Sequence, residues 1–92
     1  MTIQYSEQFL GDVGQLNEKQ KKHVTRRLSL FEGQPSHPWP NNHKLKGKLK
    51  DYCSINITGD IRAVYRYEPD KKQKGELVVK FVRLGTHSEL YG

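Results

Sequence analysis

Three short segments in the second half of the chain alternate between apolar and polar residues, and this alternation constrains the fold most. The segments cover residues 52–57, 60–68 and 76–82. Strict alternation over so few residues is typical of strands with one buried face. A Thr-Gly pair at 58–59 provides a tight turn between the first two segments, and the charged stretch 69–75 connects the second to the third. We therefore predict an antiparallel meander, with its last strand at the centre of the sheet.

The first third of the chain carries the signals of a short strand followed by two helices. Thr2–Tyr5 is a candidate edge strand, and Ser6 is a favourable N-cap residue for a helix. Asn17 and Gln20 resemble a capping box that opens a second helix. Apolar residues recur at helical spacing on both helices: Phe9, Leu10, Val13, Leu16, Val24, Leu28 and Phe31. We predict an α+β fold of order β-α-α-β-β-β, in which a helical hairpin packs on one face of a small antiparallel sheet.

A chain of 92 residues allows one domain, which we expect to span residues 1–92. At this size roughly 60–65% of the unfolded chain's surface can be buried, so the core is small. Cys53 is the only cysteine, which excludes an intrachain disulfide and suits a reducing compartment. The N-terminus lacks the basic start and apolar stretch of a signal peptide, and no apolar run is long enough to span a bilayer. These features predict a soluble, cytoplasmic protein.

The positive charge is concentrated in the second part of the chain. Residues 1–33 carry five basic groups against four acids, whereas residues 34–92 carry eleven against six, within a net charge of +6. A basic surface favours a polyanion or an acidic protein as the partner. The alternative is a soluble protein with spare lysines.

Lysines occupy every second position after His43. In an extended conformation their ammonium groups would share one side of the strand, which suits a phosphate backbone better than a specific base. The residues are Lys44, Lys46, Lys48 and Lys50. The alternative is a solvated edge whose lysines prevent edge-to-edge pairing.

The four histidines show no metal-ligand spacing, with no i, i+4 pair on a helix and no partner for Cys53. One chemistry stays open to a basic, histidine-containing protein without a metal motif. RNA is cleaved when its own 2′-hydroxyl attacks the adjacent phosphorus. That reaction needs two proton-transfer groups and cations on the phosphate, for which histidine and arginine are suited.

Residues of these types fall at the ends of the predicted strands. His43 precedes the sheet, Asp60 and Arg62 begin the middle strand, and Arg83 and His87 follow the last. Whether they converge depends on the fold. Each also has a structural alternative: Asp60 as a turn residue, Arg62 or Arg66 as an ion-pair partner, and His43 as a loop histidine. We expect Gly85 to turn the chain sharply by adopting a positive φ, and the tail after it is either docked on the sheet or frayed.

Residues 43–92 resemble the YafQ branch of the RelE/ParE superfamily, the toxin components of type II toxin–antitoxin pairs. The glycine-to-tyrosine ending is the most specific part of the match. The matching segments are His43-x-Leu45-x-Gly47, Asp51-Tyr52, Asp60-Ile61-Arg62-Ala63-Val64-Tyr65-Arg66 and Arg83-Leu84-Gly85-Thr86-His87-Ser88-Glu89-Leu90-Tyr91.

The resemblance implies an endoribonuclease, an mRNA interferase that cuts message in the ribosomal A site without a cofactor. The active positions of YafQ-type members fall on His43, Asp60, His87 and Tyr91, and a further family histidine falls on Asn56, which cannot move protons as histidine does. Arginines that RelE-type members place on the scissile phosphate match Arg62 and Arg83, so the implied catalytic set is the following: His87, His43, Asp60, Arg83, Arg62 and Tyr91.

The family also implies partners: an acidic antitoxin, the ribosome with its mRNA, and operator DNA bound only by the toxin–antitoxin complex. Two other functions stay open. ParE-type relatives share the fold but act as non-enzymatic poisons of DNA gyrase, and the histidine-containing tail argues against that activity. A catalytically dead RNA- or protein-binding module gains support from Asn56.

Overall fold

The computed structural model describes residues 2–33, 43–44 and 51–91, and it confirms the predicted α+β fold. A first strand and two helices precede the remaining strands, as expected. A two-residue strand and a short C-terminal helix are additional. The elements are β1 (Thr2–Tyr5), α1 (Glu7–Gly14), α2 (Glu18–Gly33), β2 (His43–Lys44), β3 (Cys53–Asn56), β4 (Ile61–Pro69), β5 (Leu77–Thr86) and α3 (His87–Tyr91).

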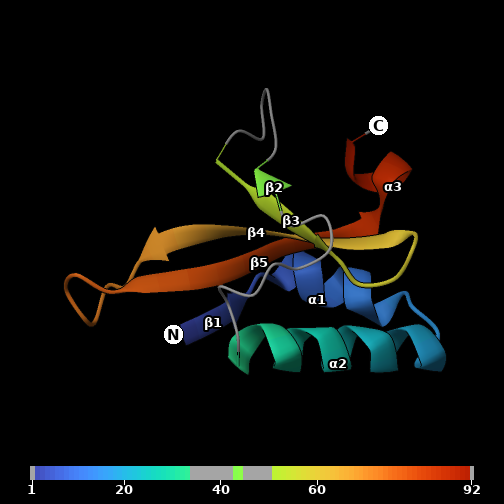
Figure 1. Ribbon diagram of the computed structural model, residues 1–92, viewed down its shortest axis with the longest axis horizontal. Helices are drawn as coiled ribbons and strands as arrows, with labels where there is room; N and C mark the ends of the chain where they lie inside the picture. The colour runs from blue at the N-terminus through green and yellow to red at the C-terminus, as the bar shows by residue number, and fades with distance from the viewer. Residues whose placement is uncertain (1, 34–42, 45–50, 92) are drawn as a thin grey trace.

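The strands form one five-stranded sheet of order β1-β5-β4-β3-β2 (Figure 1). β3, β4 and β5 make the predicted antiparallel meander. β1 lies at the edge, as expected, but runs parallel to β5, so the sheet is mixed. The prediction that the last strand is central is wrong, because β2 pairs with β3 and moves the middle position to β4.

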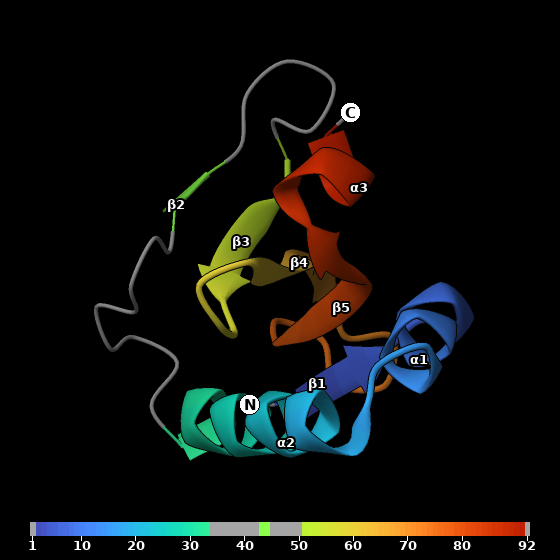
Figure 2. The ribbon, with the colours of Figure 1, turned by 90° about the vertical axis from the view of Figure 1, so that its right-hand side faces the viewer.

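The two longer helices lie on one side of the sheet, and α3 lies on the other (Figures 1 and 2). Ser6 caps α1, because its Oγ accepts from the Phe9 N–H at 3.0 Å. The capping box of α2 is confirmed: the Asn17 N–H donates to Gln20 Oε1 at 3.0 Å, and the Gln20 N–H donates to Asn17 Oδ1 at 2.8 Å. Local sequence therefore sets where both helices of the hairpin begin.

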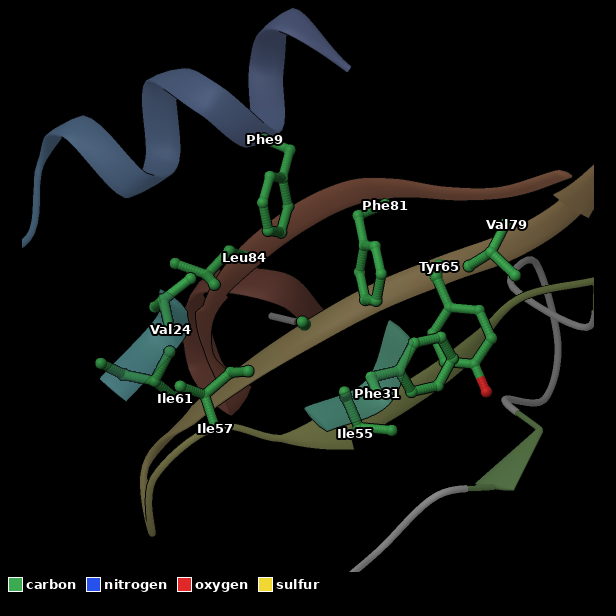
Figure 3. Close-up of a cluster of buried hydrophobic side chains, with 11 residues drawn as sticks. Phe9, Val24, Phe31, Ile55, Ile57, Ile61, Tyr65, Val79, Phe81 and Leu84 are labelled. Atoms are coloured by element: carbon green, nitrogen blue, oxygen red, sulfur yellow. The ribbon is translucent and has the colours of Figure 1, made fainter. Parts of the chain in front are cut away.

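Aromatic rings from the helices and the sheet meet in the core (Figure 3). Phe81 of β5 is at the centre, with ring-centroid distances of 5.6 Å to Phe9, 5.5 Å to Phe31 and 5.4 Å to Tyr65. Of the predicted apolar positions, Leu10 is exposed instead. Phe9, the residue before it, is in the core, and Val13 packs against that core.

β5 is longer than predicted and continues to Thr86. Gly85 therefore lies within a strand, and its φ is not positive, so the expected sharp turn is wrong. Gly85 is needed for a different reason. A Cβ there would lie 3.2 Å from Glu89 Oε1 and 3.4 Å from Glu89 Cβ, so the absent side chain lets α3 fold back over the strand.

Within the described ranges, the structure has no helix that is both long and apolar enough to cross a lipid bilayer.

Candidate active site

A capping box at the end of β5 orders the C-terminal segment. The Thr86 N–H donates to Glu89 Oε1 at 2.8 Å, and the Glu89 N–H donates to Thr86 Oγ1 at 3.2 Å. These two bonds make Thr86 the N-cap of α3, with His87 as its first residue. Hydrogen bonds from Thr86, first from its backbone and then from its side chain, hold the pKa of the Glu89 carboxyl below its ordinary value. The Thr-x-x-Glu spacing at 86–89 is the sequence signal of this helix start.

The pairing of β4 with β5 brings the start of one strand beside the end of the other. Ile61 lies opposite Thr86, and Arg62 lies opposite Gly85. Arg62 also pairs with Asn56 on its other side. The register therefore places Arg62 one strand away from the segment that leads into α3. The sequence alone did not show whether the start of β4 and the end of β5 lie close together. Their backbones are neighbours in the structure.

Arg62 and Arg66 lie on the same strand but have different surroundings. Arg66 donates from Nε to Glu68 and from Nη1 to the Tyr52 hydroxyl at 2.9 Å, and its carbon Cζ lies 5.6 Å from the Tyr52 ring centroid. The bond to Glu68 is the main reason that its pKa is raised. Arg66 is therefore the ion-pair partner foreseen as the alternative role.

Three buried polar atoms around Arg62 have no hydrogen-bond partner in the described part of the chain. They belong to two neighbouring strands: Ser54 Oγ, Asn56 Oδ1 and Arg62 Nε. An unsatisfied buried polar group costs about 1–3 kcal/mol. This end of the β3–β4 pair thus retains unused hydrogen-bonding capacity, on rows of the sheet that adjoin Gly85 and α3.

Asp60 is exposed in the turn that joins β3 to β4. The Ile57 N–H donates to the Ile61 carbonyl at 2.8 Å, and Thr58 Oγ1 accepts from the N–H groups of Asp60 at 3.3 Å and Ile61 at 3.1 Å. The predicted Thr-Gly turn is thereby confirmed. Asp60 has the turn position foreseen as its structural alternative, next to the residue that pairs with Thr86.

The remaining candidates lie on the edge strand β2, which β3 and β4 separate from β5, in α3, or outside the described residues. His43 and Lys44 form β2, opposite Ser54 and Cys53, and Tyr91 is the last residue of α3. Lys46, Lys48 and Lys50 lie outside the described residues, so the shared direction of the lysine side chains stays a prediction.

Arg83 lies within β5 and does not follow it, contrary to expectation. Its Nε donates to Asp12 Oδ2 at 3.0 Å, and the neighbouring Leu84 N–H donates to the same oxygen at 2.9 Å. The guanidinium is thus held toward α1, at the outer edge of β5. Asp12 was not singled out from the sequence, because the two residues are 71 positions apart and no local pattern connects them.

A cavity of about 200 Å³ lies between α1, β5 and α3. Asp12, Arg83, Thr86 and Glu89 are among the residues that line it. Arg62 and His87 are not among the residues that line this cavity, whereas Gly85, the residue opposite Arg62, is. In the ranges that the structure describes, no three histidine, cysteine or acidic side chains are grouped closely enough to hold a metal ion.

The sequence model of one protein family matches the whole chain. Its description is "bacterial toxin of type II toxin–antitoxin system, YafQ", and the match covers residues 1–92. Comparison with curated protein sequences found no significant match.

Solved structures with similar folds include three that contain a bacterial toxin. A histidine-to-glutamine variant of YafQ from Escherichia coli is 27% identical with a TM-score of 0.74, and the alignment covers 98% of this chain and 97% of that one. In a DinJ–YafQ toxin–antitoxin complex from E. coli, the matched chain is 29% identical with a TM-score of 0.65, and the alignment covers 98% of this chain and 96% of that one. A metal-bound toxin from Helicobacter pylori is 32% identical with a TM-score of 0.63, and the alignment covers 99% of this chain and 99% of that one.

Proposed function

This chain belongs to the YafQ family of bacterial type II toxin–antitoxin toxins, and from that premise we propose that it is an endoribonuclease that cleaves mRNA in the ribosomal A site. The observation that carries the proposal is the register of β4 and β5. It sets Arg62 opposite Gly85, one residue before the Thr86 cap from which the His87 helix starts. This register supports the proposal because it brings the strand that carries the proposed phosphate-binding cation beside the strand that leads into the helix of the proposed proton-transfer group.

The proposed reaction is attack of a ribose 2′-oxygen on the adjacent phosphorus. The 2′-oxygen forms a new bond to phosphorus, its proton passes to a base, and the bond to the 5′-oxygen breaks as that oxygen gains a proton. The products are a 2′,3′-cyclic phosphate and a 5′-hydroxyl. We propose that the reaction needs no metal, because imidazole groups can carry out the proton transfers and guanidinium groups can stabilise the charge on the phosphate.

Each candidate has a role in this proposal. His87 is a general acid or base, and His43 and Asp60 are its partner or orienting groups. Arg62 and Arg83 stabilise the pentacovalent phosphate, since a guanidinium fork can bind two oxygens at once. Tyr91 stacks on or positions a base.

Asn56 stands where the family has a further histidine. A side-chain amide is neither protonated nor deprotonated near neutral pH, so it cannot act as a general acid or base. The proton transfers therefore fall to His87 and one partner. The pairing of Asn56 with Arg62 leaves the amide beside the proposed phosphate site.

The charge of the chain supports the partners that the family implies. A net charge of +6 favours binding to RNA backbone. Lys44, Lys46, Lys48 and Lys50 would supply part of that binding. One similar structure contains a toxin of the family together with an antitoxin, and we propose that this chain also has a cognate acidic antitoxin. Operator DNA would be bound only by the pair.

A translating cell extract with primer extension on its mRNA tests the proposal. Cuts in phase with codons, at the vacant ribosomal A site, are the expected result. Intact message with trapped gyrase–DNA complexes would instead identify a gyrase poison of the ParE type. Intact message and free gyrase would identify a non-catalytic binding module. Both of these outcomes overturn the nuclease.

A further inference from the structure

We infer that Asp12 of α1 is a positioning residue for Arg83. This inference rests on the proposed function, in which Arg83 binds the scissile phosphate. Asp12 does not touch the reacting atoms. It acts by fixing the guanidinium that does.

The carboxylate of Asp12 is held by a backbone N–H group as well as by Arg83. Its Oδ2 accepts from the Leu84 backbone N–H at 2.9 Å and from Arg83 Nε at 3.0 Å. The backbone donor belongs to the part of β5 that extends beyond its parallel pairing with β1, which ends at Tyr5 and Phe81. Asp12 therefore accepts a hydrogen bond from the Leu84 N–H, which lies on the edge of β5 beyond the end of β1. The same oxygen, Oδ2, also orients the side chain of Arg83.

The helix that carries Asp12 is anchored to the same strand at its start. The Ser6 N–H donates to the Phe81 carbonyl at 2.9 Å, and Ser6 Oγ donates to the Val82 carbonyl at 2.9 Å. Ser6 and Asp12 thus tie α1 to consecutive parts of β5. Because Ser6 and Asp12 both bond to the backbone of β5, these contacts set the position of Asp12 Oδ2 relative to the strand.

The bond uses Arg83 Nε, the innermost nitrogen of the guanidinium. Holding Nε restricts the side-chain torsions that lead to it, and the bond does not require the terminal nitrogens Nη1 and Nη2. Those two nitrogens are the ones that form a fork toward phosphate oxygens. A fork that is already oriented loses less freedom when it binds.

Stability alone is a weak explanation for the pair. The side chains of Arg83 and Asp12 are 38% and 20% exposed, and ion pairs open to solvent add little stability. The pair also has an electrostatic disadvantage for an RNA-binding protein, because Asp12 places a negative charge next to a proposed phosphate-binding cation. For this reason, a positioning role predicts that loss of Asp12 lowers kcat without raising KM.

Asp12→Ala should lower kcat and leave KM unchanged or lower it. Loss of the tether misorients the fork in the transition state, which we expect to reduce kcat about tenfold to a hundredfold. Loss of the negative charge raises the net charge from +6 to +7 and favours RNA binding in the ground state. Asp12→Asn keeps an oxygen that can accept both bonds, so it should retain more of kcat than Asp12→Ala. Glu7→Gln, which removes one charge from the exposed first turn of the same helix, should leave kcat unchanged.

The combination with Arg83→Ala separates positioning from general support of the fold. If Asp12 acts through Arg83, adding Asp12→Ala to Arg83→Ala produces no further loss of kcat. The thermal unfolding of the same variants shows any loss of stability separately. A multiplicative loss of kcat in the double variant would overturn the inference, and so would a raised KM with an unchanged kcat in Asp12→Ala.

A second measurement does not depend on cleavage. The Arg83 Nε–H signal in an NMR spectrum of the full chain should exchange slowly with water, and it should exchange faster in Asp12→Ala with the remaining spectrum preserved. On binding of a 2′-O-methyl RNA, which cannot be cleaved, the terminal guanidinium signals should shift. If the wild type cleaves no message, the proposed function fails, whereas these signals still decide whether Asp12 holds the guanidinium. Equal exchange in both proteins would overturn the tether.

Discussion

Arg62 of β4 lies directly opposite Gly85 of β5, and the residue after Gly85 is the cap of the helix that begins with His87. This pairing joins the two segments that carry the proposed cation and proton-transfer group. Neither segment is close to the other along the chain. Their adjacency follows from the antiparallel register, which matches Ile61 to Thr86 and Val64 to Arg83 before it shifts by one residue, so that Tyr65 lies opposite Phe81.

Removal of the His87 imidazole should abolish cleavage. We expect His87→Ala to lower the cleavage rate about 10²–10⁴-fold, the usual contribution of a positioned acid or base. Growth arrest and primer extension measure the loss. Because the His87 side chain is exposed, antitoxin affinity and the thermal unfolding temperature should both be unchanged. His23→Ala, in an exposed position on α2, is the matched control and should remain toxic. Persistent toxicity of His87→Ala would show that the assignment is wrong.

The two arginines of β4 should separate catalysis from stability. Arg62→Ala should reduce cleavage about 10²–10³-fold, as does loss of other groups that stabilise transition-state charge. Its stability should be unchanged or higher, because the buried Nε has no partner among the described residues. Arg66→Ala should instead lower the unfolding free energy by about 1 kcal/mol through lost bonds to Glu68 and Tyr52, with cleavage retained. The reverse pattern, measured by urea unfolding and primer extension, would exclude this assignment.

A methyl group at Gly85 should displace α3. Gly85→Ala brings a Cβ to 3.2 Å from Glu89 Oε1 and 3.4 Å from Glu89 Cβ, so the helix must shift by a few tenths of an ångström or lose its cap. We expect cleavage to fall while the core remains intact, with NMR shift changes confined to α3 and its neighbours. Gly11→Ala meets nothing within 4 Å and should stabilise α1 by about 1 kcal/mol, with full activity. Equal activity of the two variants would contradict a role for the close packing of α3.

The order of α3 should depend on pH through Glu89. The hydrogen bond from the Thr86 backbone N–H is the main reason that the pKa of this carboxyl is lowered below its ordinary value in the folded protein. A lowered folded-state pKa contributes stability above the unfolded value that is lost as the pH falls through the folded value. The Thr86 amide, observed by NMR, should therefore shift and exchange faster as the pH drops below that of an ordinary carboxyl. Glu89→Gln keeps an acceptor for the cap and should remove this pH dependence. An unchanged titration in the variant would assign the effect to another group.

An imidazole at position 56 should restore a second proton-transfer group. Asn56 is half-buried beside Arg62, so Asn56→His adds a titratable group next to the proposed phosphate site. If the amide limits the rate, this variant should cleave faster than the wild type near neutral pH, whereas Asn56→Gln should not. Primer extension over a pH series measures both. A slower Asn56→His variant would show that the native amide has a role of its own.

The predicted elements that formed are those whose signals are local. Ser6 and the Asn17–Gln20 pair cap their helices with bonds that span three residues. The alternation in 52–57, 60–68 and 76–82 gave the meander, because strand faces have a period of two. The start of α3 has a local signal of the same kind, because Thr86 and Glu89 form a capping box across three residues.

Short-range hydrogen bonds, side-chain periodicity and residue identity are enough to predict the first strand, the starts of both hairpin helices, the meander and the resemblance to the family. The parallel pairing of β1 with β5, the packing of α3 against Gly85 and the contact of Asp12 with Arg83 were found only in the folded protein. Each of these joins residues through space after the sheet has closed. The energy of such contacts depends on where the partner lies, and no local pattern of residues encodes that position.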